Sequence, residues 1–378
     1  MMKKLIVASL AAALAAGCCC PCKTSCGCAP KPFGTTKYGE KAHLWTLKGK
    51  GGLVMDVTDA GGKVVRLLVP DAAGELKDVT IGFDDVSGWE RTDPYFGAII
   101  GRFGNRIAQG VFALDGQTYT LAQSDATHHA ALHGGTRGWD AYVWAAAPFA
   151  HGDDVGIVFT RTSPDGEEGF PGSVTARVTY TITPANVWRI EYEATTDKAT
   201  PLNLTQHVYF NMNGEGTILD QELMIDADTY LAVDADLAPV PGAPQTVEGT
   251  PFDFRTFHKI GARIDDPDPV LQYGPGYDHN WCLNGTGFRK VAELRGTARA
   301  VEVWTDQIGL QFYAGNFIKD DWTMKGGEKM RYRGWLALET QHYPNTPNRP
   351  DFPSVTLRPG ETYRTVTEYR FTTPTRGE

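Results

Sequence analysis

Two ionisable side chains lie in apolar, strand-like stretches of the sequence, where an unpaired charge is costly. His207 belongs to Leu202-Asn-Leu-Thr-Gln-His-Val-Tyr-Phe-Asn211, and Glu339 follows the apolar run Trp335-Leu-Ala-Leu338. A buried carboxylate must be hydrogen-bonded or functional, because burial without a partner is expensive. Glutamate and histidine, with reference pKa values of about 4.3 and 6.5, can accept and donate protons close to neutrality. For either residue alone, a hydrogen-bonded structural group is the commoner explanation.

Further polar residues occur in similar surroundings. Arg102 and Arg106 flank Asn105 directly after the apolar residues 98–101, and Asp278-His-Asn280 follows a Gly-Pro-Gly loop. Together these residues predict a polar cleft in a largely apolar protein.

A histidine cluster at residues 128–133 offers an alternative chemistry. His129 and His133 are four residues apart, a spacing that brings two ligands together only on a helix. Because Gly134 and Gly135 follow at once, we expect no helix and no metal site here.

Composition and missing motifs exclude several classes of protein. The 378-residue chain carries 36 basic and 45 acidic residues, a net charge of −9, so it lacks the basic surface that nucleic-acid binding requires. The sequence contains no P-loop, G-x-S-x-G or H-E-x-x-H motif, and Gly101-Arg-Phe-Gly104 lacks the third glycine of a dinucleotide-binding loop. We therefore expect neither nucleotide nor serine-hydrolase chemistry, and no nucleic-acid partner.

Residues 1–17 have the features of an export signal. A short basic start precedes an apolar run at residues 5–17, which is too short to span a bilayer. The run ends at Cys18 after Leu14-Ala-Ala-Gly17, which resembles a bacterial lipobox, although Ala15 stands where leucine is usual. We predict a lipoprotein that is lipidated on Cys18. Ordinary cleavage after Ala15 is the alternative, and by either route the chain is exported, to the periplasm or to a membrane anchor.

Residues 18–32 form a predicted tether in which cysteine is concentrated. The C-x-x-C spacing of Cys19 and Cys22 is one that zinc sites use, but a metal site needs folded surroundings. Local disulfides or further acylation are therefore the favoured fates of this tract. Outside it the chain has only Cys282, so the fold is not a disulfide scaffold. The cysteines of the tract are Cys18, Cys19, Cys20, Cys22, Cys26 and Cys28.

From residue 33 onward, the hydrophobic pattern has a period of two. Apolar residues occupy every even position from Val174 to Ile182, which is the pattern of a strand with one buried face. Asp115-Gly116 separates two short alternating runs and favours a tight hairpin turn. No segment carries a long helical stripe. We predict an all-β chain, with residues 33–374 forming one large antiparallel β-sandwich.

Nine segments, in order along the chain, give it a family resemblance. They are Phe96-Gly-Ala-Ile-Ile-Gly-Arg-Phe-Gly-Asn-Arg-Ile107, Leu132-His-Gly-Gly135, Ser163-Pro-Asp-Gly-Glu-Glu-Gly-Phe-Pro-Gly172, Asn203-Leu-Thr-Gln-His207, Gly276-Tyr-Asp-His-Asn280, Gly309-Leu-Gln-Phe-Tyr-Ala-Gly-Asn316, Leu338-Glu-Thr-Gln341, Pro347-Asn-Arg-Pro-Asp-Phe-Pro353 and Leu357-Arg-Pro-Gly-Glu-Thr-Tyr363. Over residues 45–371 the chain resembles the aldose 1-epimerase (galactose mutarotase) family. The resemblance implies that family's β-supersandwich.

The resemblance also implies roles for individual residues. His207 matches the family's general acid, which protonates the sugar ring oxygen, and Glu339 matches its general base, which takes the proton of the C1 hydroxyl. The sequence departs from the family pattern at Gln206 and Val208, on either side of the histidine, which affects substrate preference more than the reaction. Positions that hold the sugar hydroxyls are matched by Asn105, Arg106, His133, Asp278 and Gln311.

The expected function is interconversion of the α and β anomers of a free aldose such as glucose or galactose, an isomerase reaction with no metal and no cofactor. Two alternatives remain: a related epimerase for another sugar, such as a hexose phosphate or a pentose, and a non-catalytic sugar-binding lipoprotein on the same fold. The aldose is the expected partner, and the only membrane contact expected is through the N-terminal anchor.

Overall fold

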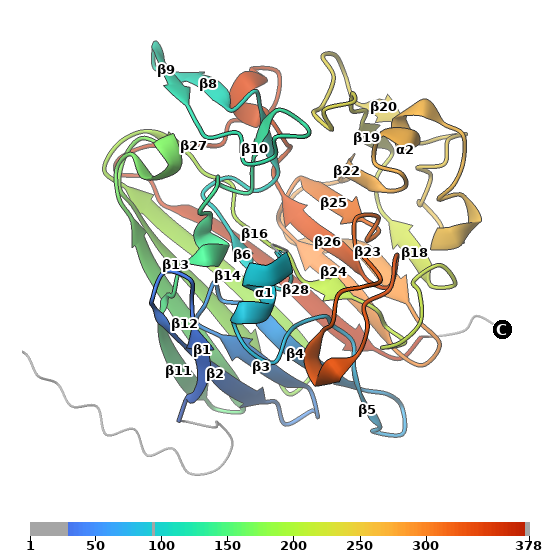
Figure 1. Ribbon diagram of the computed structural model, residues 1–378. Helices are drawn as coiled ribbons and strands as arrows, with labels where there is room; N and C mark the ends of the chain where they lie inside the picture. Colours follow the sequence, from blue (N-terminus) through green and yellow to red (C-terminus); the bar gives the residue numbers. More distant parts are fainter. Residues whose placement is uncertain (1–28, 93–94, 375–378) are drawn as a thin grey trace, which may run out of the picture.

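The computed structural model describes residues 29–92 and 95–374, and this part of the chain folds mainly into antiparallel strands (Figure 1). The predicted signal segment, the Cys18 lipidation site and the cysteines of the tether lie outside the described residues. The first strand, β1, begins at Lys31, two residues before the predicted start of the domain. No helix in the described ranges is long and apolar enough to cross a membrane.

The segment with alternating apolar residues forms a strand, as its sequence predicts. Strand β13 spans Val174–Ile182 and buries all five even-numbered side chains, while Thr175 and Arg177 are exposed. A two-residue connection joins Leu114 to its partner Gln117, and Asp115 and Gly116 have φ of 50° and 79°. Positive φ at both positions is what the tight hairpin turn requires. The all-β antiparallel sandwich predicted from the sequence is confirmed.

Three sheets make up most of the protein. The largest has nine strands, in the spatial order β11 (Ala145–His151), β12 (Asp154–Ser163), β13, β14 (Val187–Thr196), β28 (Tyr363–Thr372), β24 (Ala300–Thr305), β23 (Arg289–Arg295), β18 (Glu222–Ile225) and β21 (His258–Lys259). The six-stranded sheet has the order β17 (Tyr209–Phe210), β26 (Leu336–Gln341), β25 (Gly309–Tyr313), β22 (Asp278–Cys282), β19 (Thr229–Leu231) and β20 (Gln245–Thr246). The five-stranded sheet runs from β1 (Lys31–Thr35) through β2 (Lys41–Lys48), β3 (Val54–Thr58) and β4 (Val64–Pro70) to β5 (Leu76–Asp78).

Short strand pairs and single helical turns connect and cover these sheets. The pairs are β6 (Ile99–Ile100) with β16 (Thr205–Gln206), β7 (Arg106–Ala108) with β10 (Ala130–Leu132), β8 (Val111–Leu114) with β9 (Gln117–Thr120), and β15 (Thr200–Pro201) with β27 (Thr356–Leu357). The helices are α1 (Ser87–Thr92), α2 (Pro269–Tyr273), and the 3-10 turns at Trp139–Ala141, Glu167–Gly169, Ile260–Ala262, Lys325–Gly327 and Thr346–Asn348.

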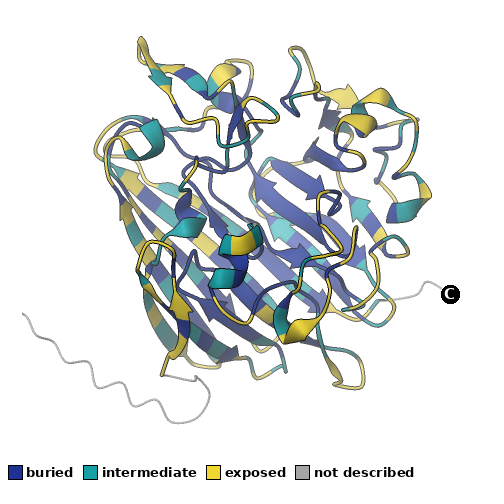
Figure 2. Cartoon of the chain, viewed as in Figure 1, coloured by how far each residue is buried: buried dark blue, intermediate teal, exposed yellow. Residues whose placement is uncertain are grey.

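Strands β22, β25 and β26 of the six-stranded sheet are buried on both faces, and each face packs against a different part of the protein (Figure 2). In β26, Leu336 and Leu338 point into the main core that this sheet shares with the nine-stranded sheet. The alternating residues Ala337 and Glu339 therefore point the other way, because successive side chains of a strand face opposite sides. The same alternation places Gln311 of β25 on the face that carries Glu339.

Candidate active site

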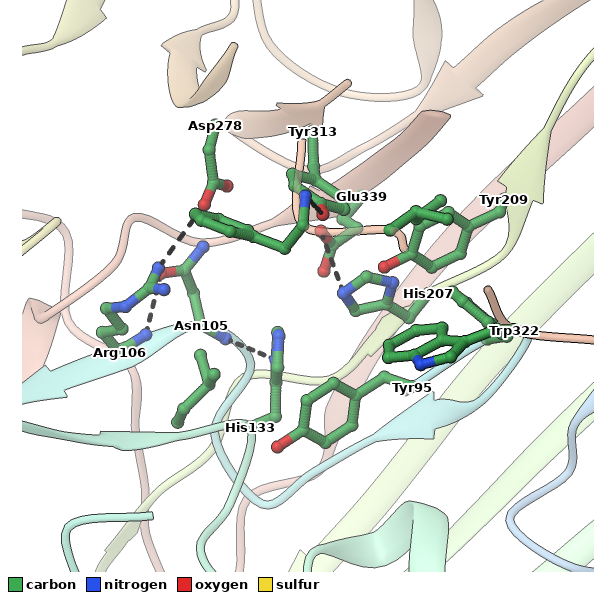
Figure 3. Close-up of a pocket in the computed structure, with 14 residues that line it drawn as sticks. Tyr95, Asn105, Arg106, His133, His207, Tyr209, Asp278, Tyr313, Trp322 and Glu339 are labelled. Atoms are coloured by element: carbon green, nitrogen blue, oxygen red, sulfur yellow. Dashed lines mark hydrogen bonds and ion pairs between the residues drawn. The ribbon is translucent and has the colours of Figure 1, made fainter. Parts of the chain in front are cut away.

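A cavity of about 190 Å³ lies over this second face of the six-stranded sheet (Figure 3). It combines acidic, basic and imidazole side chains with aromatic rings, a mixture suited to a ligand with both hydroxyl groups and apolar C–H surfaces. Its lining consists of Tyr95, Phe96, Asn105, Arg106, Leu132, His133, His207, Tyr209, Asp278, Tyr313, Phe317, Ile318, Trp322 and Glu339.

His207 and Glu339 meet in the wall of this cavity, from segments 132 residues apart in the sequence. His207 Nε2 lies 3.5 Å from Glu339 Oε1, and both side chains are at most 5% exposed. Among the described residues, Glu339 Oε2 and His207 Nδ1 have no hydrogen-bond partner. Glu339 Oε2 is thus an uncommitted acceptor, held ready by a buried strand.

Two tyrosine rings fix the plane of the His207 imidazole. Tyr209 stacks on it with ring centres 5.0 Å apart and planes 19° apart, and Tyr95 lies at 5.8 Å and 27°. Tyr209 follows His207 by two residues, so the local chain direction places both rings over the cavity. The stacking restrains the rotation of the imidazole and leaves its edge available for hydrogen bonding.

Burial shifts both members of the pair toward their uncharged forms. It lowers the pKa of His207 to about 3 and raises the pKa of Glu339 well above its usual value, with the nearby Asp278 carboxylate adding to the second effect. A protonated Glu339 beside a neutral His207 holds one proton in total, as does the corresponding ion pair. The pair thus keeps one proton to give and one site to receive a proton, whichever partner holds it.

His133 and Asn105 hold each other through their backbones. The backbone N–H of Asn105 donates to His133 Nδ1 over 3.1 Å, and the backbone N–H of His133 donates to the Asn105 carbonyl over 3.1 Å. Burial lowers the pKa of His133 well below its usual value, so the ring is neutral. Since Nδ1 accepts, Nε2 must carry the ring proton, and His133 is a hydrogen-bond donor on the cavity wall.

Arg106 and Asp278 belong to a chain of charged and polar groups beside the pair. Arg106 Nε donates to Asp125 Oδ2 over 3.1 Å, and Arg106 Nη1 lies 3.9 Å from Asp278 Oδ2. Gln311 Nε2 donates to Asp278 Oδ1 over 2.8 Å. His128 Nδ1 lies 2.8 Å from the same Asp125 Oδ2 and 2.9 Å from Asp125 Oδ1. This chain fixes the orientation of the Asp278 carboxylate and the Arg106 guanidinium, both of which face the cavity.

Comparisons with known proteins identify the family of the chain. A sequence model of the family described as aldose 1-epimerase matches residues 43–370. The chain belongs to the aldose 1-epimerase family.

Within the family, a galactose mutarotase from Homo sapiens is 41% identical over 326 residues, which cover 84% of this chain and 91% of the human protein. An aldose 1-epimerase from Escherichia coli K12 is 36% identical over 348 residues, covering 88% of this chain and 96% of that protein. Among solved structures, a galactose 1-epimerase from Lactobacillus acidophilus superimposes with a TM-score of 0.81 at 25% identity, covering 92% of this chain and 99% of the other.

The structure brings together all seven side chains that the family resemblance assigned to the site. His207, Glu339, Asn105, Arg106, His133 and Asp278 line the cavity. The seventh, Gln311, stands opposite Glu339 in the β25–β26 register and contacts Asp278 instead of lining the cavity. It therefore acts on the cavity through the Asp278 carboxylate.

Arg102, singled out with Arg106 in the sequence, does not line the cavity. Its guanidinium is buried, and it donates to Ser163 Oγ over 2.7 Å and to the carbonyls of Ser163, Pro164 and Pro171 over 3.0, 2.6 and 2.9 Å. Burial lowers its pKa to about 10. Arg102 thus holds the loop after β12 in place.

Sequence reasoning missed several contributors to the cavity. Tyr209 and Tyr313 each lie two residues after a predicted site residue, so strand periodicity could have placed them on the same face. No sequence signal pointed to Asp125, Tyr95 or Trp322, which reach the site from loops.

The three side chains nearest one another in the cavity also merit a test as metal ligands. Ligand atoms of His133, His207 and Glu339 lie within 4.8 Å of one another. A ligating imidazole needs an unprotonated nitrogen toward the metal and normally donates its other N–H to a fixed acceptor. His133 has the opposite arrangement, since its Nδ1 accepts from Asn105, and no described group accepts from His207 Nδ1. The donor set therefore fits proton transfer better than metal binding.

Proposed function

We propose that this family member interconverts the α and β anomers of free aldoses, with Glu339 as general base and His207 as general acid. The observation that supports this most directly is the buried pair in the cavity wall. Its members lie 3.5 Å apart, and Glu339 Oε2 has no hydrogen-bond partner in the described part of the chain. The names of the relatives, galactose mutarotase and aldose 1-epimerase, support the same reaction.

The reaction needs a proton to leave the C1 hydroxyl while another reaches the ring oxygen. The shared proton first passes from Glu339 to His207, whose Nε2 lies 3.5 Å from Glu339 Oε1. The Glu339 carboxylate then takes the C1 hydroxyl proton while His207 gives its proton to the ring oxygen, so the C1–ring-oxygen bond breaks and an open-chain aldehyde forms. Rotation about C1–C2 presents the other face of the aldehyde. Ring closure then runs with the roles reversed: His207 takes the proton of the attacking hydroxyl and Glu339 returns one to the new C1 hydroxyl. Each positioned acid or base contributes about 10²- to 10⁴-fold.

The charges around the cavity favour a neutral sugar. Arg106 is the only cation among the described lining residues, and Asp125 and Asp278 already neutralise it. A sugar phosphate would bring a charge with no free counter-ion, so free aldoses such as glucose and galactose are the proposed substrates. Tyr313, Trp322 and Tyr95 supply aromatic surface for the C–H face of the ring.

Polarimetry tests this function directly. Freshly dissolved α-D-glucose and α-D-galactose approach their anomeric equilibrium slowly on their own, and the protein is expected to accelerate both approaches. A methyl glycoside, whose anomeric oxygen is blocked, is the matched control and should show no rotation change. Binding of the free sugars without acceleration would support the non-catalytic sugar-binding protein instead.

The N-terminal sequence supports a second proposal, about location. Residues 1–17 direct export, and Cys18 becomes the lipidated first residue of a mature protein anchored at a bacterial membrane. Mass spectrometry of the mature N-terminus should find a diacylated or triacylated Cys18. An unmodified terminus at Ala16 would contradict the lipid anchor and leave a freely periplasmic enzyme.

A further inference from the structure

A second cavity, of about 580 Å³, lies on the other side of the loop that joins β25 to β26. The five-stranded sheet contributes Asp56, Arg66 and Asp78, and the loop contributes Met324 and Lys325. Among the described residues, none lines both this cavity and the catalytic one. The second cavity is about three times the volume of the first.

An apolar cluster forms the partition between the two cavities. The side of the cluster that lines the catalytic cavity consists of Phe96, Tyr209 and Ile318. The side that lines the second cavity includes Phe83 and Trp335. Phe83 lies 6.1 Å from Phe96, whose ring is 4.7 Å from Tyr209. The second cavity therefore has aromatic surface of its own, separated from Tyr209 of the catalytic cavity by one layer of side chains.

The three cations that line the second cavity are already paired with carboxylates. Arg66 binds the Asp56 carboxylate over 2.7 Å, and Lys325 binds Asp78 over 2.9 Å. Lys77, the third cation, binds Glu215 over 2.9 Å. An anionic ligand would have to displace one of these partners. A neutral ligand with several hydroxyl groups could instead hydrogen-bond to their remaining donor and acceptor sites.

We propose that this second cavity binds a neutral saccharide of more than one sugar unit. A saccharide has hydroxyl groups that alternate with apolar C–H surfaces. The hydroxyl groups would face the ion pairs of this cavity, and the C–H surfaces would face Phe33, Phe83 and Trp335. The indole Nε1 of Trp335 makes no hydrogen bond to any described residue and is a further donor for such a ligand. Size separates the two sites, since the smaller cavity suits a single ring and the larger one has room for two or more. The binding requires no proton transfer, so it does not depend on the proposed catalytic roles.

Calorimetric titration of the full chain with non-reducing oligosaccharides tests the proposal. Raffinose, methyl β-cellobioside and methyl β-maltoside lack a free anomeric hydroxyl and cannot be turned over. At least one is expected to bind with a dissociation constant in the millimolar range or below, equally well to wild type and to Glu339→Gln. Arg66→Met should weaken this binding about tenfold or more, because a hydrogen bond to a charged group is lost.

Arg364→Met is the matched control, because Arg364 is also a strand arginine paired with a carboxylate, Glu193, outside the cavity. It should leave the affinity unchanged. If Arg66→Met fails to fold, Lys77→Met replaces it, since Lys77 lines the cavity and pairs with an exposed glutamate. Absence of saturable binding for all three saccharides would overturn the proposal. So would unchanged binding in the folded cavity variant, or tighter binding of a sugar acid or sugar phosphate than of the neutral compounds.

Discussion

His207 Nε2 lies 3.5 Å from Glu339 Oε1, and the two side chains are so deeply buried that neither charged form is favoured. Reference pKa values alone suggest a charged glutamate beside a half-protonated histidine at neutral pH. Burial instead favours a neutral pair that shares one proton. A sugar that places its C1 hydroxyl and ring oxygen against this pair can hydrogen-bond to Glu339 Oε2, which has no partner among the described residues. The same contacts allow proton transfer between the sugar and the pair.

Replacing either member of the pair should remove turnover while preserving sugar binding. Glu339→Gln keeps the size of the side chain but cannot take up the C1 proton, so we expect kcat to fall by at least about 10²-fold. His207→Asn should cause a similar loss at the ring oxygen. Polarimetry corrected for spontaneous mutarotation measures kcat, and circular dichroism checks folding. Near-normal turnover in folded Glu339→Gln would refute the mechanism.

The pH profile should show that the pair titrates as a buried unit. Its single proton is retained from the lowered pKa of His207, about 3, up to the raised pKa of Glu339. We therefore expect kcat/KM to be flat between about pH 5 and 7, where an exposed histidine would titrate near 6.5. Initial rates at matched ionic strength provide the measurement. A clear step close to pH 6.5 would show that His207 is not held neutral by burial.

The raised pKa of Glu339 should lower the free energy of unfolding at neutral pH. In the unfolded chain it ionises near pH 4.3, whereas in the folded protein it stays protonated to higher pH, so the folded state binds more protons above about pH 4.3. The free energy of unfolding then falls as pH rises, by up to about 1.4 kcal/mol per pH unit until the folded pKa is reached. Glu339→Gln removes this loss.

We expect Glu339→Gln to be more stable than wild type at pH 7, with a smaller difference at pH 5. Denaturant unfolding of both proteins at the two pH values gives the comparison. His207 has the opposite dependence, since its lowered pKa removes stability as pH falls from about 6.5 toward 3. That contribution is present in both proteins and largely cancels. A variant less stable than wild type at pH 7 would contradict a protonated Glu339.

The strands were predictable because their signal is local. The alternation of apolar residues from Val174 to Ile182 predicts a strand, and the tolerance of Asp115-Gly116 for positive φ predicts a tight turn. Both are found in the structure. The site was different: periodicity showed only that Glu339 and His207 were unusual, and the family resemblance was needed to pair them. Their 3.5 Å approach depends on how β26 and the β16–β17 segment pack, which a linear pattern does not encode.

Arg102 and Arg106, which belong to one sequence motif, also show that a linear pattern does not reveal the role of a residue. They are four residues apart and chemically identical, yet Arg102 binds the carbonyls of Ser163, Pro164 and Pro171 while Arg106 binds Asp125 and Asp278. Nothing in the sequence around them distinguishes an arginine that supports a loop from one that faces the substrate. Their partners lie 19 or more residues away along the chain.

Substitutions of the two arginines should therefore have different effects on the activity of the protein. Arg106→Ala removes the cation that orients Asp278, so we expect a higher KM together with a lower kcat. It also leaves the buried Asp125 and Asp278 carboxylates without their counter-ion, so the free energy of unfolding should fall as well, by about 3 kcal/mol or more. Arg102→Lys keeps the charge but cannot satisfy several buried acceptors at once, so we expect a loss of at least about 3 kcal/mol in the free energy of unfolding. Its activity per folded molecule should stay close to wild type. Steady-state kinetics and denaturant unfolding on both variants separate the two roles. An Arg102→Lys protein that is stable but inactive would place Arg102 in the substrate site instead.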